Sequence, residues 1–320
     1  DHAGIATQMV TEREMAKQGA PSRREMGRDA FTLRVWKQKK DSRGTIIGQL
    51  KRLGASADWS REAFTMSGAP NAPAGEEGNF HDAVIKVFVD LYAKGFIYRG
   101  KRLVNWDPHF ETAISDLEVE NTEEKGHLWH FRYPLAGGAT TKDGASFIVV
   151  ATTRPETLLG DTAVAVHPSD PRYAQLIGKR VIIPFVDRPV PILGDDFVDQ
   201  AFGTGAVKVT PAHDPNDREV GLRHNLPALT ILDEAAHIVA DAPKPFAGME
   251  RFAARKAIVA ALDALGLLVS VKPHTANPAR CQRSNDILEP RLRTQWFIRT
   301  KPLAEKALAA TRSGKTRIVP

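Results

Sequence analysis

The spacing of apolar side chains is mostly helical over the first 130 residues. Apolar residues recur at three- and four-residue intervals between positions 81 and 94, at Val84, Val87, Phe88, Leu91 and Tyr92. This spacing predicts an amphipathic helix that ends at Gly95. A first helix is expected from about residue 5 to Gly19, a glycine suited to ending it. The stretch 67–79 is rich in Gly, Pro and Ala and predicts a loop.

From about residue 146 the apolar pattern becomes that of strands. Short β-branched runs are separated by Gly, Pro and Asp, as in FIVVATT, TAVAVHP, RVIIPFV, PVPIL, GAVKVTP and PALTIL. Strands at this spacing predict a compact barrel or sandwich. Asp214 followed by Pro215 is typical of a helix start and predicts a short helix through Arg223. Another helix is expected over residues 250–265, with an apolar face formed by Ile258, Leu262 and Leu265.

The charge distribution follows the same division of the chain. Residues 1–60 carry 12 basic and 7 acidic side chains, residues 272–320 carry 11 and 3, and the segment between them carries 21 and 28. Two basic ends around an acidic middle hint at a polyanionic partner. Together with the change of apolar pattern, they favour a β-rich domain inserted into a mostly helical one.

Composition excludes several classes of protein. With 42% hydrophobic and 26% charged residues, the chain is of ordinary globular composition. Cys281 is the single cysteine, which excludes an intrachain disulfide framework and a multi-cysteine zinc site and favours a reducing compartment. No apolar stretch approaches the roughly 18 residues of a membrane span, so no membrane partner is expected. The start, DHAGIATQMV, has neither a signal-peptide pattern nor an initiator Met, and a fragment is expected.

The densest group of polar residues is divided between two segments. Segment 151–168 crowds polar side chains around a turn after an apolar strand, at Thr152, Thr153, Arg154, Glu156, Thr157 and Asp161. Segment 202–217 carries Lys208 and Thr210 on one strand face and continues to His213, Asp214 and Asp217. Each group has a structural explanation in a turn or an N-cap. A polar ligand pocket explains them together, because such groups are costly to bury unpaired.

Other candidate sites are weaker. Gly203, Thr204 and Gly205 resemble a phosphate-binding loop but lack the Lys-Ser/Thr ending of a P-loop. His127 and His130 are interpreted as part of a strand surface, because no second pair of ligands is nearby, and no metal site is predicted. The tryptophans are interpreted as core anchors rather than base-stacking platforms; these are Trp106, Trp129 and Trp296.

Longer motifs connect the chain with a known family. The segments are DHAGIATQ (1–8), GRDAF (27–31), LGASADWSREAFTM (53–66), YRGKRLVNWDP (98–108), AISDLEVE (113–120), VVATTRPETLLGDTAVAVHP (149–168), FGTGAVKVTPAHDPNDREVG (202–221) and QWFIRTKPLAEKAL (295–308). They resemble the valyl-tRNA synthetase family of class I and cover nearly the whole chain. Leucyl and isoleucyl relatives share the TTRPET and GTG elements, but they do not usually have DHAGIATQ or the KVT sequence.

The resemblance implies an α/β fold with a partial class I Rossmann-type nucleotide-binding domain and an inserted, β-barrel-like editing domain. Residues 1–135 would be the first part of the Rossmann-type domain with its connection, 136–273 the editing domain, and 274–320 the return. The HIGH-type and KMSKS-type motifs and the anticodon-binding domain are absent. The family's cofactor, ATP with Mg²⁺, would therefore meet an incomplete site. A cytoplasmic location and a monomeric state are expected.

The implied function is part of a ligase that attaches valine to tRNA(Val). A valine pocket cannot strongly reject the nearly isosteric threonine, a limit for which valyl-tRNA synthetases are themselves the known example. A second site that hydrogen-bonds the threonine hydroxyl removes the error by hydrolysing threonyl-tRNA(Val), with no cofactor. The expected partners are the acceptor end of tRNA(Val) and threonine or valine as its aminoacyl ester.

The resemblance also implies roles for individual residues. Asp214 and Asp217 would hold the α-ammonium group and, with Lys208 and Thr210, recognise the side-chain hydroxyl; the division between the two aspartates stays open. The remaining substrate-binding candidates are Thr152, Thr153, Arg154, Glu156, Thr157, Phe202, Gly203, Thr204, His213 and Asp1. Among them, Arg154 is assigned to the phosphate or ribose side and Phe202 to the adenine. His213 is a candidate general base, and Asp1 matches the amino-group ligand of the synthetic site.

Three alternatives remain open. One is a tRNA-binding or folding-only module without turnover. Another is a free-standing editing factor, against which the broken HIGH-type region argues. The last is the editing domain of an isoleucyl or leucyl relative.

Overall fold

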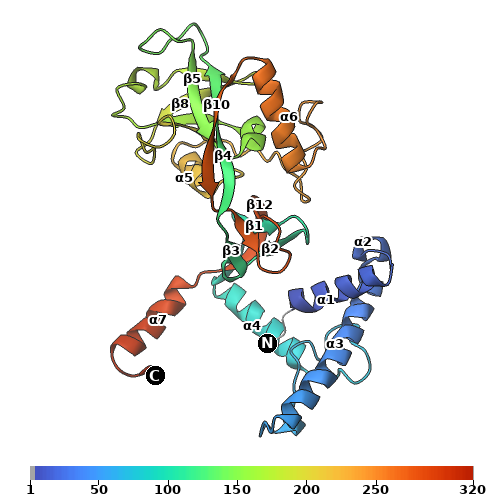
Figure 1. The fold of residues 1–320 in the computed structure, drawn as a ribbon. Helices are drawn as coiled ribbons and strands as arrows, with labels where there is room; N and C mark the ends of the chain where they lie inside the picture. Colours follow the sequence, from blue (N-terminus) through green and yellow to red (C-terminus); the bar gives the residue numbers. More distant parts are fainter. Residues whose placement is uncertain (1–3, 320) are drawn as a thin grey trace. The chain divides into compact units, whose positions relative to one another are not determined.

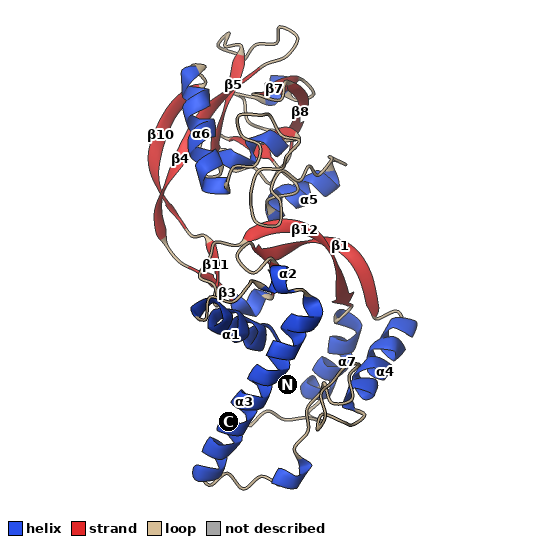
Figure 2. Ribbon diagram, turned by 90° about the vertical axis from the view of Figure 1, so that its right-hand side faces the viewer, coloured by secondary structure: helices blue, strands red, loops and turns tan. Residues whose placement is uncertain are grey.

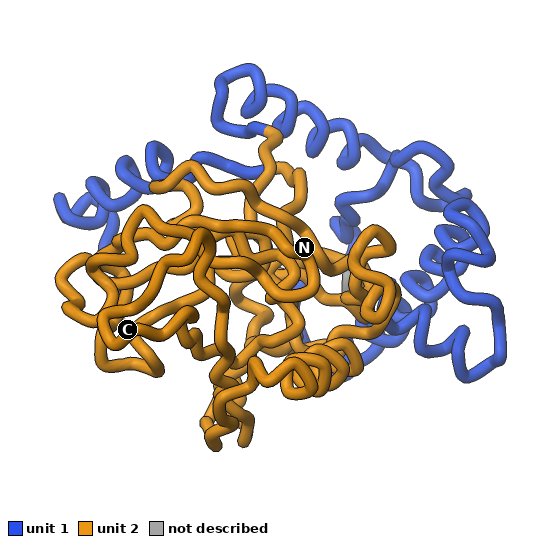
Figure 3. Tube along the Cα trace, turned by 90° about the horizontal axis from the view of Figure 1, so that it is seen from above, with its two compact units in different colours: residues 1–98, 297–320 blue, residues 99–296 orange. Residues whose placement is uncertain are grey.

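The computed structural model describes residues 4–319 and divides into two compact units. One unit comprises residues 1–98 with 297–320, and the other comprises residues 99–296 (Figure 3). All but one of the candidate site residues lie in the second unit. The exception, Asp1, lies outside the described residues.

The first unit consists mainly of helices (Figure 1). They are α1 (Gly4–Lys17), α2 (Arg23–Met26), α3 (Arg28–Arg52), α4 (Phe80–Ala93) and α7 (Lys301–Arg312), with a 3-10 turn, η1, at Trp59–Arg61. Helices α1 and α2 pack against α3. The predicted helix over residues 81–94 is confirmed as α4, and Gly95 follows it with φ of 73°. The predicted stop after the first helix is also confirmed, since Gly19 has φ of 65°.

The predicted Rossmann-type domain is not confirmed. Among the described residues of the first unit, strands are limited to the ends of β1 (Ile97–Asp107) and β12 (Glu289–Ile298), which continue into the second unit. A Rossmann-type fold needs several parallel strands side by side. The chain is instead shown as a mixed α/β fold whose strands pair mostly antiparallel.

The second unit contains most of the strands. They are β2 (Thr112–Ile114), β3 (Val119–Asn121), β4 (Glu124–Pro134), β5 (Phe147–Thr152), β6 (Ala163–Val166), β7 (Arg180–Ile183), β8 (Arg188–Gly194), β9 (Ala206–Val209), β10 (Leu268–Ala276) and β11 (Ala279–Cys281). Its helical segments are α5 (Pro215–Arg223), α6 (Arg251–Ala264) and the 3-10 turns η2 (Asp116–Glu118), η3 (Pro155–Gly160) and η4 (Ala174–Leu176). The sheets have the strand orders β12-β1-β2, β10-β4-β5, β11-β3 and β7-β8-β6-β9.

Two of these sheets position the candidate site. Strand β4 runs antiparallel to both β5 and β10, and Figure 2 shows β4 and β10 as long ribbons side by side. In the four-stranded sheet, β6 pairs antiparallel with β9 and parallel with β8. An isolated bridge between Leu135 and Val181 links the two sheets. A closed barrel is not shown. Strand β4 ends before residue 136, where the predicted editing domain begins, but it pairs with β5 inside that domain. The domain boundaries stay a prediction.

The core of the second unit lies between these sheets and α6. Its largest fully buried side chains include Phe131, Tyr133, Ile148, Ile258 and Leu262. Helix α6 confirms the predicted helix over 250–265 and buries two of the three predicted apolar positions. Leu265 is the exception: it is the residue after the last turn, and it is 61% exposed.

Most of the predicted strands are confirmed, and one is wrong. The PALTIL segment forms no ladder beyond a single bridge between Leu232 and Ile238. Pro227 has no N–H to donate, and the N–H of Ile231 donates to a histidine ring instead of a strand. The predicted loop over 67–79 is confirmed. None of the described helices is both long enough and apolar enough to span a bilayer.

Candidate functional site

A buried lysine lies at the centre of the polar residues. Lys208 is on β9, opposite Val164 of β6, and is 6% exposed. Its ammonium group donates to Thr157 Oγ1 (2.7 Å), Asp161 Oδ1 (2.9 Å) and Thr210 Oγ1 (2.5 Å). An ammonium group has three donors. All of them are therefore used inside the protein.

Asp161 is the counter-charge of this lysine. Its Oδ1 also accepts from the Thr210 hydroxyl (2.6 Å), and its Oδ2 accepts from the Tyr133 hydroxyl (2.6 Å). The carboxylate is fully buried, and burial raises its pKa against the opposing effect of Lys208. Burial and the neighbouring Asp161 also raise the pKa of Tyr133 well above its ordinary value. Four hydrogen bonds to Lys208 and Asp161 thus hold Thr157, Thr210 and Tyr133 in place.

Two further carboxylates flank this network at the start of α5. Asp214 is the predicted N-cap, and its Oδ1 accepts from the N–H groups of Asn216 (2.8 Å) and Asp217 (3.1 Å). Asp217 is 8% exposed, and its Oδ2 accepts from the N–H of Thr210 (2.8 Å). Burial, reinforced by the charge of Asp214, raises the pKa of Asp217 to about 7. Asp217 is therefore the titratable group of the site that changes charge near neutral pH.

His213 is buried beside these carboxylates. Its Nε2 accepts from the N–H of Ile231 (2.9 Å), so the ring proton is assigned to Nδ1, which has no partner among the described residues. Burial and the charge of Arg154 lower the pKa of His213 well below its ordinary value. A neutral ring with its lone pair already used does not act as a general base in this conformation.

Arg154 is held by acidic partners. Its guanidinium donates to Glu289, to Glu156 Oε1 (3.2 Å) and to the backbone oxygen of His213 (2.8 Å). Glu156 is fully buried and also accepts from Arg255 (2.7 and 2.8 Å). The guanidinium of Arg154 is thus hydrogen-bonded within the protein, and its assignment to the phosphate or ribose side stays a prediction. The hydroxyl of Thr152 accepts from the N–H of Arg154 (3.0 Å) and shapes the turn.

The remaining candidates lie on the loop before β9. Thr204 donates its hydroxyl to the backbone oxygen of Val149 (2.6 Å) and so ties this loop to β5. Gly203 has φ of 61°, a conformation that favours glycine. Phe202 is 52% exposed, with its ring 6.2 Å from that of His274. Its role as an adenine contact stays a prediction.

The structure thus brings together most of the predicted residues and adds others. Tyr133 was not expected, because it is 28 positions from Asp161 and no local pattern links them. Asp161 was recognised only as a member of a polar turn. Glu289, Arg251 and Arg255 were also not expected. No three carboxylate, histidine or cysteine side chains gather as a metal site among residues 4–319.

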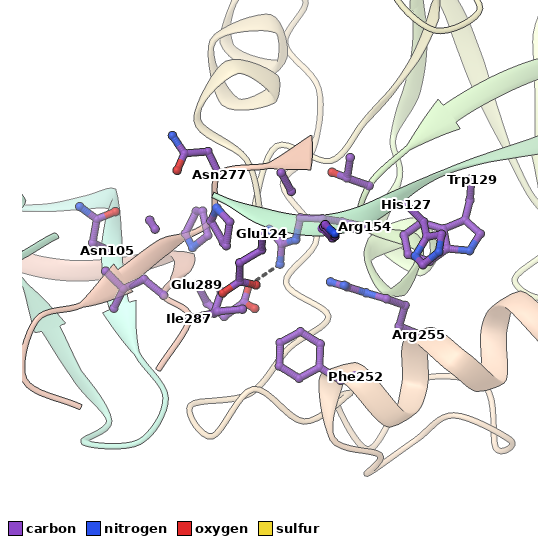
Figure 4. A pocket seen from close by; sticks show the side chains of 18 residues that line it. Asn105, Glu124, His127, Trp129, Arg154, Phe252, Arg255, Asn277, Ile287 and Glu289 are labelled. Carbon is purple, nitrogen blue, oxygen red and sulfur yellow. Dashed lines mark hydrogen bonds and ion pairs between the residues drawn. The ribbon is translucent and has the colours of Figure 1, made fainter. Parts of the chain in front are cut away.

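A cavity of about 600 Å³ opens beside this network (Figure 4). Thr153 and Arg154 line it together with β4, the start of α6 and segments 276–279 and 287–290. Lys208, Thr210 and Asp217 do not belong to its wall. Arg154 connects the two, because it lines the cavity and its backbone oxygen accepts from the hydroxyl of Thr157 (3.0 Å).

Comparison with known proteins assigns the class. The family model of tRNA synthetases class I (I, L, M and V) matches residues 1–320, and the chain belongs to this family. It is 55% identical over all 320 residues to a valine--tRNA ligase of Geobacter sulfurreducens and spans 34% of that protein's length. A solved structure, the ternary complex of Agrobacterium radiobacter K84 agnB2 LeuRS-tRNA-LeuAMS, covers 88% of this chain and 42% of its own at 19% identity, with a TM-score of 0.34.

Proposed function

We propose that the second unit contains the editing domain of a valine--tRNA ligase, predicted over residues 136–273, and that this domain hydrolyses threonyl-tRNA(Val). The observation that carries the proposal is the buried network of Lys208, Asp161 and Thr210 next to the carboxylate of Asp217. Support also comes from the 55% identity to a valine--tRNA ligase. The complete ligase would join valine to tRNA(Val) in the cytoplasm.

The amino acid is held by its ammonium group. Oδ2 of Asp217 is used by the backbone, and no hydrogen bond involves its Oδ1 among the described residues. Asp214 supplies a second negative charge close enough to raise the pKa of Asp217. A bound ammonium group would neutralise this repulsion and lower the pKa of Asp217, so substrate binding and ionisation reinforce each other.

Selection between threonine and valine depends on a hydroxyl. The hydroxyls of Thr157 and Thr210 are fixed by Lys208, and Asp161 is the acceptor that both Lys208 and Thr210 share. A threonine hydroxyl can exchange hydrogen bonds with such a lining. Valine offers no polar group, so its methyl group would lie against this polar lining without a hydrogen bond in exchange, which is unfavourable in a buried site.

The chemical step is attack by water on the ester carbonyl. The C–O bond to the tRNA ribose breaks, the free amino acid and the ribose hydroxyl are released, and the water proton passes to the ribose oxygen directly or through a ribose hydroxyl. Orientation of the water supplies much of the acceleration. ATP with Mg²⁺ serves the ligase reaction and enters no step of this hydrolysis.

Deacylation of two substrates by the purified chain tests the proposal. Threonyl-tRNA(Val) should be hydrolysed well above its spontaneous rate, and valyl-tRNA(Val) should be spared. No valine-dependent exchange of pyrophosphate with ATP is expected. Equal hydrolysis of both esters would contradict threonine editing, and filter binding of tRNA without turnover would instead support a non-catalytic module.

A further inference from the structure

Tyr133 is hydrogen-bonded to the Lys208 network through Asp161. It lies on β4, opposite Ile148 of β5, and its side chain is fully buried. Its hydroxyl donates to Asp161 Oδ2 at 2.6 Å. A buried hydroxyl adds nothing to apolar packing and is costly without a partner. The reason for a tyrosine rather than a phenylalanine at this position therefore lies in its hydrogen bond to Asp161.

The direction of each hydrogen bond in the network follows from the chemistry of its partners. An ammonium group only donates, whereas an ionised carboxylate and a backbone carbonyl only accept. The Thr210 hydroxyl therefore accepts from Lys208 (2.5 Å) and donates to Asp161 Oδ1 (2.6 Å). The Thr157 hydroxyl accepts from Lys208 (2.7 Å) and donates to the backbone oxygen of Arg154 (3.0 Å). The polar hydrogen atoms of these side chains are thus all engaged within the protein.

Only acceptors are left over for a ligand at this lining. A hydroxyl oxygen has two lone pairs, and Lys208 uses one on Thr157 and one on Thr210. Each of these hydroxyls keeps its second lone pair, and Oδ1 of Asp217 has no hydrogen bond among the described residues. A ligand hydroxyl can consequently join this lining only as a donor. A group of the same size that cannot donate finds no partner there.

This order of hydrogen bonds requires an ionised Asp161. A protonated carboxyl group donates, which would allow the Thr210 hydroxyl to turn round. Burial raises the pKa of Asp161, while Lys208 and the hydroxyls of Thr210 and Tyr133 lower it. Of these three groups, Tyr133 is the one that does not belong to the lining. Its hydroxyl also occupies Oδ2, which leaves Oδ1 to Lys208 and Thr210.

We propose that Tyr133 is a positioning residue that fixes the direction of the hydrogen bonds in the lining, so that the site selects threonine as a hydrogen-bond donor. Tyr133 acts through Asp161 and does not touch the substrate. The inference rests on the proposed function, because the hydroxyls of Thr157 and Thr210 are taken as the surface that the substrate side chain meets. It extends the rejection from valine to any side chain of similar size that only accepts.

Two esters of tRNA(Val) distinguish donation from size. One carries threonine, and the other carries 2-amino-3-fluorobutanoate of the same configuration, in which fluorine replaces the hydroxyl and cannot donate. Each enzymatic rate is divided by the spontaneous rate of the same ester, which removes the difference in ester reactivity. The wild type should prefer the threonyl ester about tenfold or more in kcat/KM, the worth of one hydrogen bond in a buried site.

Tyr133→Phe keeps the ring and removes only the hydroxyl. It should lower the preference for the threonyl ester at least about threefold, because Asp161 is no longer fixed. Tyr173→Phe is the matched control, since Tyr173 is half-buried in the same unit and its hydroxyl donates to the backbone oxygen of Thr204 (3.0 Å), outside the network. The control should leave the preference within about twofold of the wild type.

A merely structural role of Tyr133 would lower both rates by the same factor and leave the preference unchanged. An unchanged preference in Tyr133→Phe, an equal fall in Tyr173→Phe, or equal rates of the two esters with the wild type would overturn the proposal. Circular dichroism checks the fold of both variants. An unfolded Tyr133→Phe would also overturn the proposal, because the hydroxyl would then be a requirement of the fold.

A binding measurement separates this proposal from the editing function. If the wild type hydrolyses neither ester, the editing function fails. Titration with threoninamide and with 2-amino-3-fluorobutanamide, followed by NMR, then decides the role of Tyr133. Tighter binding of threoninamide to the wild type, with a smaller difference in Tyr133→Phe, would support the positioning role. Equal binding of the two amides to the wild type, or the same difference in both proteins, would overturn it.

Discussion

The ammonium group of Lys208 lies 2.9 Å from Oδ1 of Asp161, with exposed side-chain fractions of 7% and 0%. Both charged groups are shielded from water, so each is stabilised mainly by the opposite charge of its partner. A buried ion pair of this kind contributes little net stability relative to an apolar pair, but it is strongly destabilising to break, because the remaining charge is left uncompensated. The main effect of the Lys208–Asp161 pair is therefore to position the hydroxyls that line the site. Its contribution to the stability of the fold is smaller.

Lys208→Met should destabilise the second unit by roughly 3–5 kcal/mol, because Asp161 would stay buried without its cation. The free energy of unfolding in urea measures the effect. Lys208→Met combined with Asp161→Asn should recover part of the loss, since no charge is then left unpaired. Additive losses in the double variant would show that the two residues are not coupled. Deacylation should fail in both variants.

Asp217 predicts a pH dependence of stability. Its folded-state pKa of about 7 lies above the value near 3.9 of an unfolded chain. Between these values the folded state binds more protons, so the free energy of unfolding falls as pH rises from about 4 to 7 and then levels off. Asp217→Asn should remove this fall and stabilise the protein at pH 8 by on the order of 4 kcal/mol. Asp214→Asn should reduce the total fall and end it at a lower pH, because Asp214 contributes to the raised pKa of Asp217.

The same variant should separate stability from activity. An asparagine at position 217 keeps an oxygen for the N–H of Thr210 but offers no charge to an ammonium group. Asp217→Asn should therefore abolish deacylation of threonyl-tRNA(Val) while the protein remains folded. In the wild type, kcat/KM should rise with pH as Asp217 ionises near pH 7. Unchanged deacylation rates in Asp217→Asn would show that Asp217 takes no part in the site.

Local chemistry made half of this site predictable. Alternation along a strand placed Lys208 and Thr210 on one face, and N-cap chemistry identified Asp214, because both rules operate within a few residues. Tyr133 and Glu289 were not predictable, because their hydrogen bonds to Asp161 and Arg154 join residues 28 and 135 positions apart in the chain. The strand predicted over PALTIL is wrong for a related reason. Its β-branched residues favour a strand, but the N–H of Ile231 donates to the ring of His213, which is distant in the chain.

Close packing at Gly160 supports the position of Thr210. A Cβ at residue 160 would lie 3.1 Å from the backbone oxygen of Leu229, 3.1 Å from Thr210 Cγ2 and 3.2 Å from Ile231 Cγ1. Gly160→Ala should cost about 1–3 kcal/mol and lower deacylation, since Thr210 must move to make room. Gly126→Ala is the control, because its Cβ would meet ordinary contacts of 3.5 and 3.6 Å. Equal stability of the two variants would show that the turn at Gly160 accommodates the methyl group.

Glu289 links two arginines and should stabilise the fold. Glu289 accepts from Arg154 and, at 2.8 Å, from Arg251. Arg154 keeps a second acidic partner in Glu156, and Arg251 keeps one in Asp286. Glu289→Gln should therefore cost only about 1–2 kcal/mol, less than breaking an isolated buried pair. The free energy of unfolding in urea measures the loss, and Glu305→Gln in α7 is the control, because Glu305 is exposed. Equal stability of the two variants would show that the ion pairs of Glu289 contribute nothing to the fold.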